Sequence, residues 1–159
     1  MDESLKITGN LEIIKRDSEG NIVDTRSIPN LIVNSGKNEI TKRIVGVTGS
    51  PFGGAFGRMA IGSNSAPTIL ATTTLGPTEV QSISPLQNVI ASNTITYTAV
   101  FVGKDGTAEE DGKTHSITEA AILNSPTANA GTMLCRTTFS TISKEPTSSL
   151  TVNWNITVS

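Results

Sequence analysis

The stretch Leu150–Ser159, LTVNWNITVS, alternates apolar and polar side chains from end to end. Its apolar side chains all stand at even-numbered positions: Leu150, Val152, Trp154, Ile156 and Val158. Successive side chains of a β-strand point to opposite faces of the sheet, so this period of two predicts a strand with one buried face. A strand with one apolar and one polar face is typical of an antiparallel sheet. The segment therefore predicts a mainly β fold.

The same alternation recurs upstream of this strand. In Thr94–Phe101 the side chains of Ile95, Tyr97, Ala99 and Phe101 share one face, and threonines occupy most of the other. Further strands are predicted at 5–13, 21–26, 58–62, 117–124 and 133–139, with a short apolar run at 31–33. Clusters of Gly, Pro, Asn, Asp and Ser separate several of these segments, which favours antiparallel connections by short turns.

Two segments near the N-terminus carry sharper local signals. The sequence DSEGN at 17–21 predicts a hairpin turn, because Gly and Asn accept positive φ. Pro29 is expected to end the second strand, because proline has no N–H to donate to a sheet.

One short helix is predicted, over Gly36–Val45. Ile40 and Ile44 lie four residues apart and so share a face, and Glu39 and Arg43 can pair at the same spacing. A helix of about ten residues is not stable by itself in water, so we expect it to pack on the sheet.

These elements predict an antiparallel β-sandwich of about seven to eight strands with one short α-helix. The chain has 159 residues, which suggests a single domain spanning 1–159. Within it, residues 1–28 form either an N-terminal hairpin or an arm that reaches over a neighbouring subunit.

Composition and charge exclude several classes of partner. The net charge is −2 and the pI is about 5.4, so the clustered Lys and Arg that bind phosphates or anionic lipids are not expected. The apolar runs are far shorter than the roughly 20 residues that span a bilayer. The first residues, MDESLKITGN, do not resemble a signal peptide. We therefore expect a soluble protein made in a cytoplasm, with no nucleic acid or membrane as partner.

Few residues are candidates for chemistry. His115 is the only histidine and Cys135 the only cysteine, so one chain can form neither an internal disulfide nor a zinc site of Cys and His ligands. His115 could act as a general base, but a solvated loop histidine fits its polar surroundings better. Cys135 lies in a predicted strand, which favours a small core residue over a nucleophile.

Two loops superficially resemble ligand sites. The 104–116 loop holds four acids, and a weak calcium site competes there with a solvated hairpin tip. Their spacing is not that of the twelve-residue calcium loop. The run GGAFG at 53–57 lacks the Lys-Ser/Thr ending of a phosphate-binding loop and leads into a strand rather than a helix. We therefore predict no catalytic residue, cofactor or metal, and no enzymatic activity.

The order of several motifs resembles a known group of proteins. PNLIVNSGK at 29–37 leads into the predicted helix, and RMAIG at 58–62 is followed by a loop of Ser, Pro and Thr that closes on Thr74, Leu75 and Glu79. ITEAAILN at 117–124, MLCRTTF at 133–139 and LTVNW at 150–154 follow in the second half. From about Asn30 onward this layout resembles small virion proteins of tailed bacteriophages, including the N-terminal part of some tail-collar fibre proteins. Ala121 stands where that family often has Gly.

The resemblance implies assembly rather than catalysis. It implies a structural protein of the virion that is made in the host cytoplasm, and a chain this short suits a capsid decoration, or cement, protein better than a fibre. Its expected partners are the major capsid protein or tail proteins, and it is expected to form a homo-oligomer, for which a trimer is one arrangement. A tail, collar or baseplate adaptor is the alternative.

The segment from Arg58 to Val80 is the candidate contact surface under this interpretation. It is rich in small Thr, Ser and Ala side chains, which lose little rotamer entropy on ordering, and Ile69 and Leu70 add apolar area. We name Arg58, Ile69, Leu70, Thr74 and Leu75 as the candidate interaction residues. An ordinary long connection is the competing interpretation.

Two other classes of function compete with assembly. A carbohydrate-binding β-sandwich needs exposed aromatic rings, whereas Trp154 and Tyr97 lie on predicted apolar faces. An enzyme would require His115 and the acids of the 104–116 loop to gather in one cleft.

Overall fold

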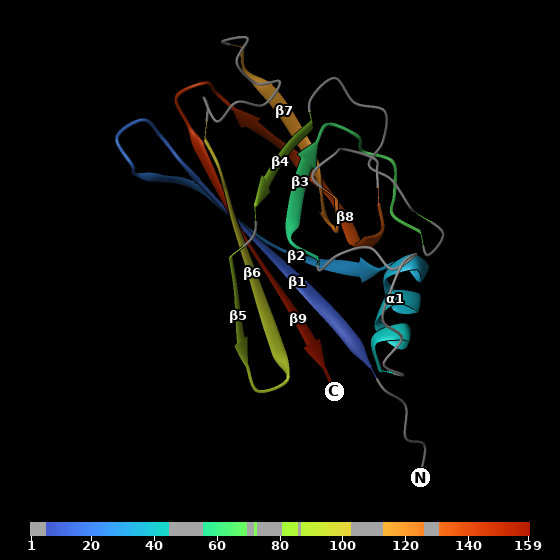
Figure 1. Ribbon diagram of the computed structural model, residues 1–159. Helices are drawn as coiled ribbons and strands as arrows, with labels where there is room; N and C mark the ends of the chain where they lie inside the picture. The colour runs from blue at the N-terminus through green and yellow to red at the C-terminus, as the bar shows by residue number, and fades with distance from the viewer. Residues whose placement is uncertain are drawn as a thin grey trace.

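The strands that the structure describes form one sheet that curls around the main core, and a helix packs against one of its strands (Figure 1). The computed structural model describes residues 6–44, 56–69, 72, 81–85, 87–102, 113–125 and 131–159. Its elements are β1 (Ile7–Arg16), β2 (Ile22–Ile32), α1 (Asn34–Ile44), β3 (Arg58–Gly62), β4 (Gln81–Pro85), β5 (Gln87–Ala91), β6 (Thr94–Phe101), β7 (His115–Leu123), β8 (Met133–Lys144) and β9 (Ser149–Val158). The mainly β prediction with one helix is confirmed for the part of the chain so described.

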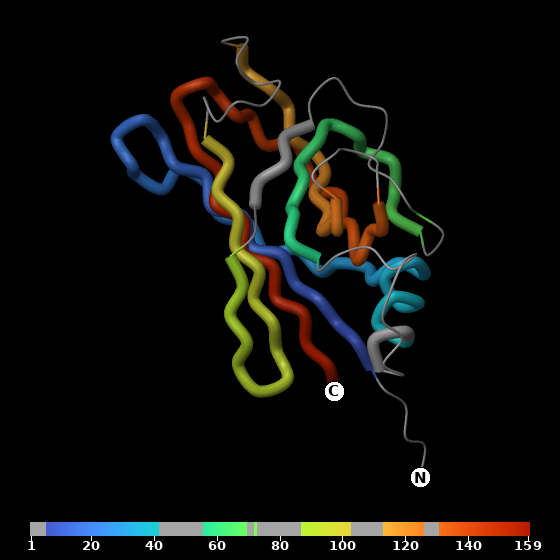
Figure 2. The backbone as a smooth tube through the Cα atoms, in the orientation of Figure 1, coloured from blue at the N-terminus to red at the C-terminus, as the bar shows by residue number. Residues whose placement is uncertain are grey.

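The strands follow the order β4-β3-β7-β8-β2-β1-β9-β6-β5, and every neighbouring pair is antiparallel. The predicted sandwich of two separate sheets is not confirmed. Strand β2 pairs with β1 along most of its length and with β8 only through Leu31 and Ile32, so it carries the sheet around the bend. The result is a half-barrel whose two sides face each other across the core (Figures 1 and 2).

Strand β9 lies near the centre of this sheet, between β1 and β6. Trp154 pairs with Leu11 on one side and Tyr97 on the other, and all three side chains are buried. The alternation read from the sequence is therefore confirmed in both β9 and β6. Because three neighbouring strands turn the same apolar face inward, they form one continuous wall of the core.

Proline does not end β2, contrary to the prediction. The strand continues through Pro29, which lies opposite Asn10 of β1, and ends at Ile32. The backbone of β2 pairs with β8 only at Leu31 and Ile32, beyond Pro29. At Pro29 the contact with β8 is a side-chain hydrogen bond: the Thr137 hydroxyl donates to the Pro29 carbonyl at 3.0 Å. A missing N–H is tolerated at such an edge position, since no ladder hydrogen bond is lost there.

Strands β3 and β7 are buried on both faces, unlike β9. Every side chain from Ile117 to Leu123 is buried, although Glu119 lies among them. One face packs into the main core, and Ala60, Ala121 and Leu123 belong to a second, smaller cluster on the other face. This double burial explains why the run ITEAAIL reads as nearly continuous apolar sequence.

Helix α1 packs against β8, as a short helix must. A Cβ atom on Gly36 would lie 2.1 Å from the carbonyl oxygen of Leu134, so only glycine allows this approach of helix to strand. The Ser35 hydroxyl donates to the Met133 carbonyl at 2.8 Å, and Ile40 packs on the core. The Arg43 side chain, and with it the expected pair with Glu39, lies outside the described residues.

Candidate functional site

The described part of the predicted contact surface is ordered by a buried ion pair. Arg136 Nε donates to Glu119 Oε2 at 2.8 Å, and the two side chains are 3% and 0% exposed. Three further hydrogen bonds reach the segment after β3. The second Glu119 oxygen accepts from the Asn64 amide, and Arg136 Nη1 donates to the Ala66 carbonyl. Arg136 Nη1 also donates to the Thr68 hydroxyl at 3.1 Å.

These contacts fasten residues 63–69, which we call the β3 loop, onto β7 and β8. Gly62 is needed for this packing, because a Cβ atom there would meet Glu119 Oε1 at 2.6 Å. From the sequence, Arg136 was predicted only as part of the strand at 133–139, and its ion pair with Glu119 was not predicted. Its one sequence signal is a Glu and an Arg placed inside two otherwise apolar strands.

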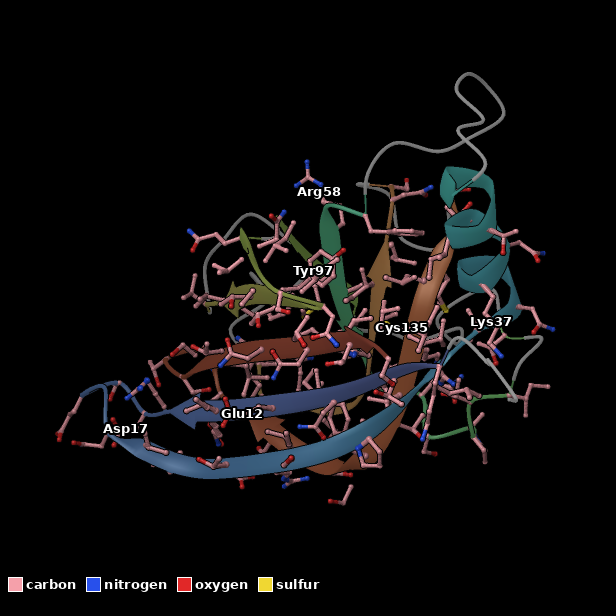
Figure 3. The ribbon with its side chains drawn as sticks, turned by 90° about the horizontal axis from the view of Figure 1, so that it is seen from below. Glu12, Asp17, Lys37, Arg58, Tyr97 and Cys135 are labelled. Atoms are coloured by element: carbon pink, nitrogen blue, oxygen red, sulfur yellow. The ribbon has the colours of Figure 1, made fainter. Side chains whose placement is uncertain are left out.

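Of the five predicted interaction residues, the structure describes Arg58 and Ile69. Ile69 is 62% exposed at the end of the β3 loop, and its backbone is held by reciprocal bonds with Thr72. Arg58 is half-buried at the start of β3, and its side chain points away from the core (Figure 3). The other three predicted residues, Leu70, Thr74 and Leu75, lie outside the described residues.

The candidates for chemistry are described only in part. His115 is the first residue of β7 and pairs with Lys144 in the strand register, and residues 103–112 of the acidic loop lie outside the described part. Cys135 is fully buried, and that burial raises the pKa of its thiol well above the ordinary value. Among the described residues no group of acids, His and Cys could hold a metal ion.

The outer face of the central strands is polar, and its side chains form hydrogen bonds with one another across the strands. Thr96 donates to Asn155 at 2.7 Å and Thr98 donates to Asn153 at 3.0 Å. Asn153 in turn donates to Glu12 of β1 at 3.0 Å. These cross-strand hydrogen bonds leave little unmet polar demand on this face.

An apolar pocket of about 330 Å³ opens on the inner side of the sheet. Side chains of β1, β5, β6 and β9 form one wall, including Ile90 and Tyr97. Ile40 of α1, Phe56 and Leu134 of β8 form the opposite wall. The wall residues are mostly hydrocarbon, so this pocket suits an apolar side chain better than a polar ligand.

Both aromatic residues that a carbohydrate site could have used are committed to the interior. Trp154 is fully buried, and Tyr97 is 8% exposed and lines the pocket (Figure 3).

In the described part of the chain, no helix has the length and apolar character needed to cross a bilayer. Comparison with protein-family models, with curated proteins and with solved structures found no match to this chain.

Proposed function

We propose that this chain is a structural protein of a tailed-bacteriophage particle, and that it acts as a capsid decoration protein that binds and stabilises the shell. The observation that carries this proposal is the β3 loop. It lies in the segment whose sequence resembles phage virion proteins, and a buried ion pair holds it in place. Because hydrogen bonds to Glu119 and Arg136 already hold the loop, its exposed side chains can bind a partner with little further loss of chain entropy.

Ile69 is the side chain on which we expect the shell contact to rest. It is 62% exposed, and the Arg136–Thr68 hydrogen bond anchors the residue before it. A decoration protein makes many such small contacts, each repeated by the symmetry of the shell, so modest apolar surfaces suffice for stable attachment. The protein acts as a homo-oligomer in this proposal, and its partner is the major capsid protein.

The test is co-sedimentation of the purified chain with undecorated heads and, separately, with isolated tails of a phage that encodes it. We expect saturable binding to heads at a fixed number of copies per capsid subunit. Binding to tails alone would favour the adaptor function, and binding to neither particle would overturn a role in the virion.

Two matched variants locate the contact. Ile69→Asp is expected to weaken head binding at least tenfold, because a charge replaces the exposed apolar side chain. Ile22→Asp makes the same change at a residue of similar exposure, 55%, in the β1–β2 hairpin, and is expected to bind like the wild type. Equal loss in both variants would show that the β3 loop is not the contact.

A further inference from the structure

Among the strands that the structure describes, β5 is an edge of the sheet, and its composition is unusual. It is the last strand in the sheet order, with β6 as its neighbour, and it carries the two most exposed large apolar side chains in the described part of the chain. Val89 is 67% exposed and Ile90 is 70% exposed. Their side chains point to opposite faces of the sheet. Strand β5 therefore exposes apolar side chains on both of its faces.

The edge carries none of the features that usually keep strands apart. Natural edge strands are protected by charges, by proline or by bulges. The sequence from Val80 to Gly103 contains no charged residue, and β5 itself has no proline. The opposite edge differs: β4 ends in Pro85, which has no N–H to offer to a further strand.

The β5 edge is also held in a fixed position. It joins β6 through a two-residue turn in which Ser92 has a φ of 54°. Asn93 of this turn donates through its side chain to the Val158 carbonyl at 2.7 Å, and its own carbonyl accepts from the Val158 amide. The hairpin is therefore tied to the end of β9, and its outer backbone groups form a ready template for another strand.

We infer that β5 pairs with β5 of a second copy of this chain, antiparallel and about a twofold axis, so that two curled sheets become one. A strand without charges can pair with its own image without like-charge repulsion, whereas a charge on the axis would face its own copy. Head-to-tail pairing of β5 with β4 is disfavoured, because Pro85 interrupts the donor row of that edge. Pairing of like with like gives a closed dimer rather than a trimer.

The pairing also brings a second chain next to the apolar pocket. Asn88 and Ile90 line this pocket from β5. If the axis passes at Val89, Asn88 of one copy lies opposite Ile90 of the other on the inner face. Each Ile90, exposed in a single chain, is then buried beside the pocket of its neighbour. This removes apolar surface from water in addition to forming the backbone hydrogen bonds.

The mass of the full chain in solution tests the pairing. We expect twice the 16.6 kDa of one chain over a dilution series for the wild type, and a single-chain mass for Val89→Lys. Val100→Lys is the matched control, because Val100 is 46% exposed on the same outer face of β6, one strand further in. It should remain a dimer, with its dissociation constant changed less than threefold.

Cross-linking tests which strand lies on the axis. Cys135 is fully buried, so Val89→Cys supplies the one accessible thiol among the described residues, and it is expected to form a disulfide-linked dimer on oxidation. Val100→Cys should stay a single chain. A wild type of single-chain or trimeric mass, a dimer unaffected by Val89→Lys, or equal cross-linking of the two cysteine variants would overturn the inference. None of these results depends on the proposed function, which concerns the β3 loop on the other side of the molecule (Figures 1 and 2).

Discussion

Glu119 and Arg136 show how two charged residues come to lie inside an apolar layer. Either charge would be costly to bury alone, but together they form an ion pair with an N–O distance of 2.8 Å. Each also forms a hydrogen bond to the backbone of the β3 loop. Such a pair rarely adds much stability over a well-packed apolar pair, yet losing one partner leaves a charge without compensation. We therefore assign it the role of fixing the loop's position rather than that of a main source of stability.

Arg136→Met and Glu119→Gln are each expected to lower the free energy of unfolding by about 3–5 kcal/mol, because each leaves one buried group uncompensated. The double variant should cost less than the sum of the two, since the charges are removed together. Denaturant unfolding followed by the fluorescence of Trp154, the only tryptophan, measures this. Lys15→Met, in the more exposed pair with Glu145, is the control and should cost about 0–1 kcal/mol. Strictly additive single-variant effects would contradict the pairing.

Asp17 gives a prediction about pH at the tip of the β1–β2 hairpin. The Asn21 side chain lowers the pKa of Asp17 below its ordinary value of 3.8, and the amides of Asn21, Glu19 and Gly20 contribute in the same direction. A carboxyl with a lowered folded pKa stabilises the fold above its unfolded pKa, and this contribution is lost as the pH falls through the folded value. The turn should therefore loosen only below about pH 4.

Asn21→Ala is expected to raise the pKa of Asp17 toward 3.8, because the main hydrogen bond to the carboxylate is removed. Titration of the Asp17 carboxyl carbon by NMR measures this shift. Asn10→Ala, which removes an amide that bonds Ser27 elsewhere on the same hairpin, should leave the Asp17 pKa unchanged. An unchanged Asp17 pKa in Asn21→Ala would contradict the assigned cause.

Among the elements, α1 depends on one backbone approach. Gly36→Ala would place a methyl group 2.1 Å from the Leu134 carbonyl oxygen, so the helix must shift away from β8. We expect a loss of about 1–3 kcal/mol in the free energy of unfolding, as for overpacking in a core. Gly20→Ala provides the comparison: nothing lies within 4 Å, but its φ of +87° costs an alanine about 1 kcal/mol. A Gly36→Ala variant as stable as the wild type would show that the helix does not need this contact.

The sequence predicts some of these elements well and others not at all, for physical reasons. Apolar and polar side chains alternate strictly in β6 and β9, because each strand has one buried face and one face toward solvent. Both strands were predicted to within one residue of their ends. Strands β4 and β5 were missed, because their Gln, Ser, Asn and Pro residues look like loop sequence. Their pairing with β3 and β6 is set by tertiary contacts rather than by their own periodicity.

The curvature of the whole sheet could not be predicted either. Alternation tells which side chains share a face, but not which strands are neighbours. The continuous sheet depends on β2, whose last two paired residues reach β8 after the strand has passed Pro29. The contact surface stays a prediction, for which the structure shows only that Ile69 is exposed. The Glu119–Arg136 ion pair and the β5 edge carried no pattern that the sequence analysis recognised.

In the whole molecule, the β5 edge and the β3 loop lie on different sides of the curled sheet (Figures 1 and 2). We propose that the β5 edge joins two copies of the chain and that the β3 loops attach this pair to a larger structure. A dimer doubles the number of attachment loops, which raises the effective affinity for a repetitive surface such as a shell. We propose that this attachment stabilises the shell.

The temperature at which undecorated phage heads release their DNA, measured with and without saturating protein, shows whether the attached protein stabilises the shell. We predict a higher release temperature with the wild type and with Ile22→Asp, and a smaller increase with Ile69→Asp at the same protein concentration. A release temperature that stays unchanged at saturating wild-type protein would contradict the account.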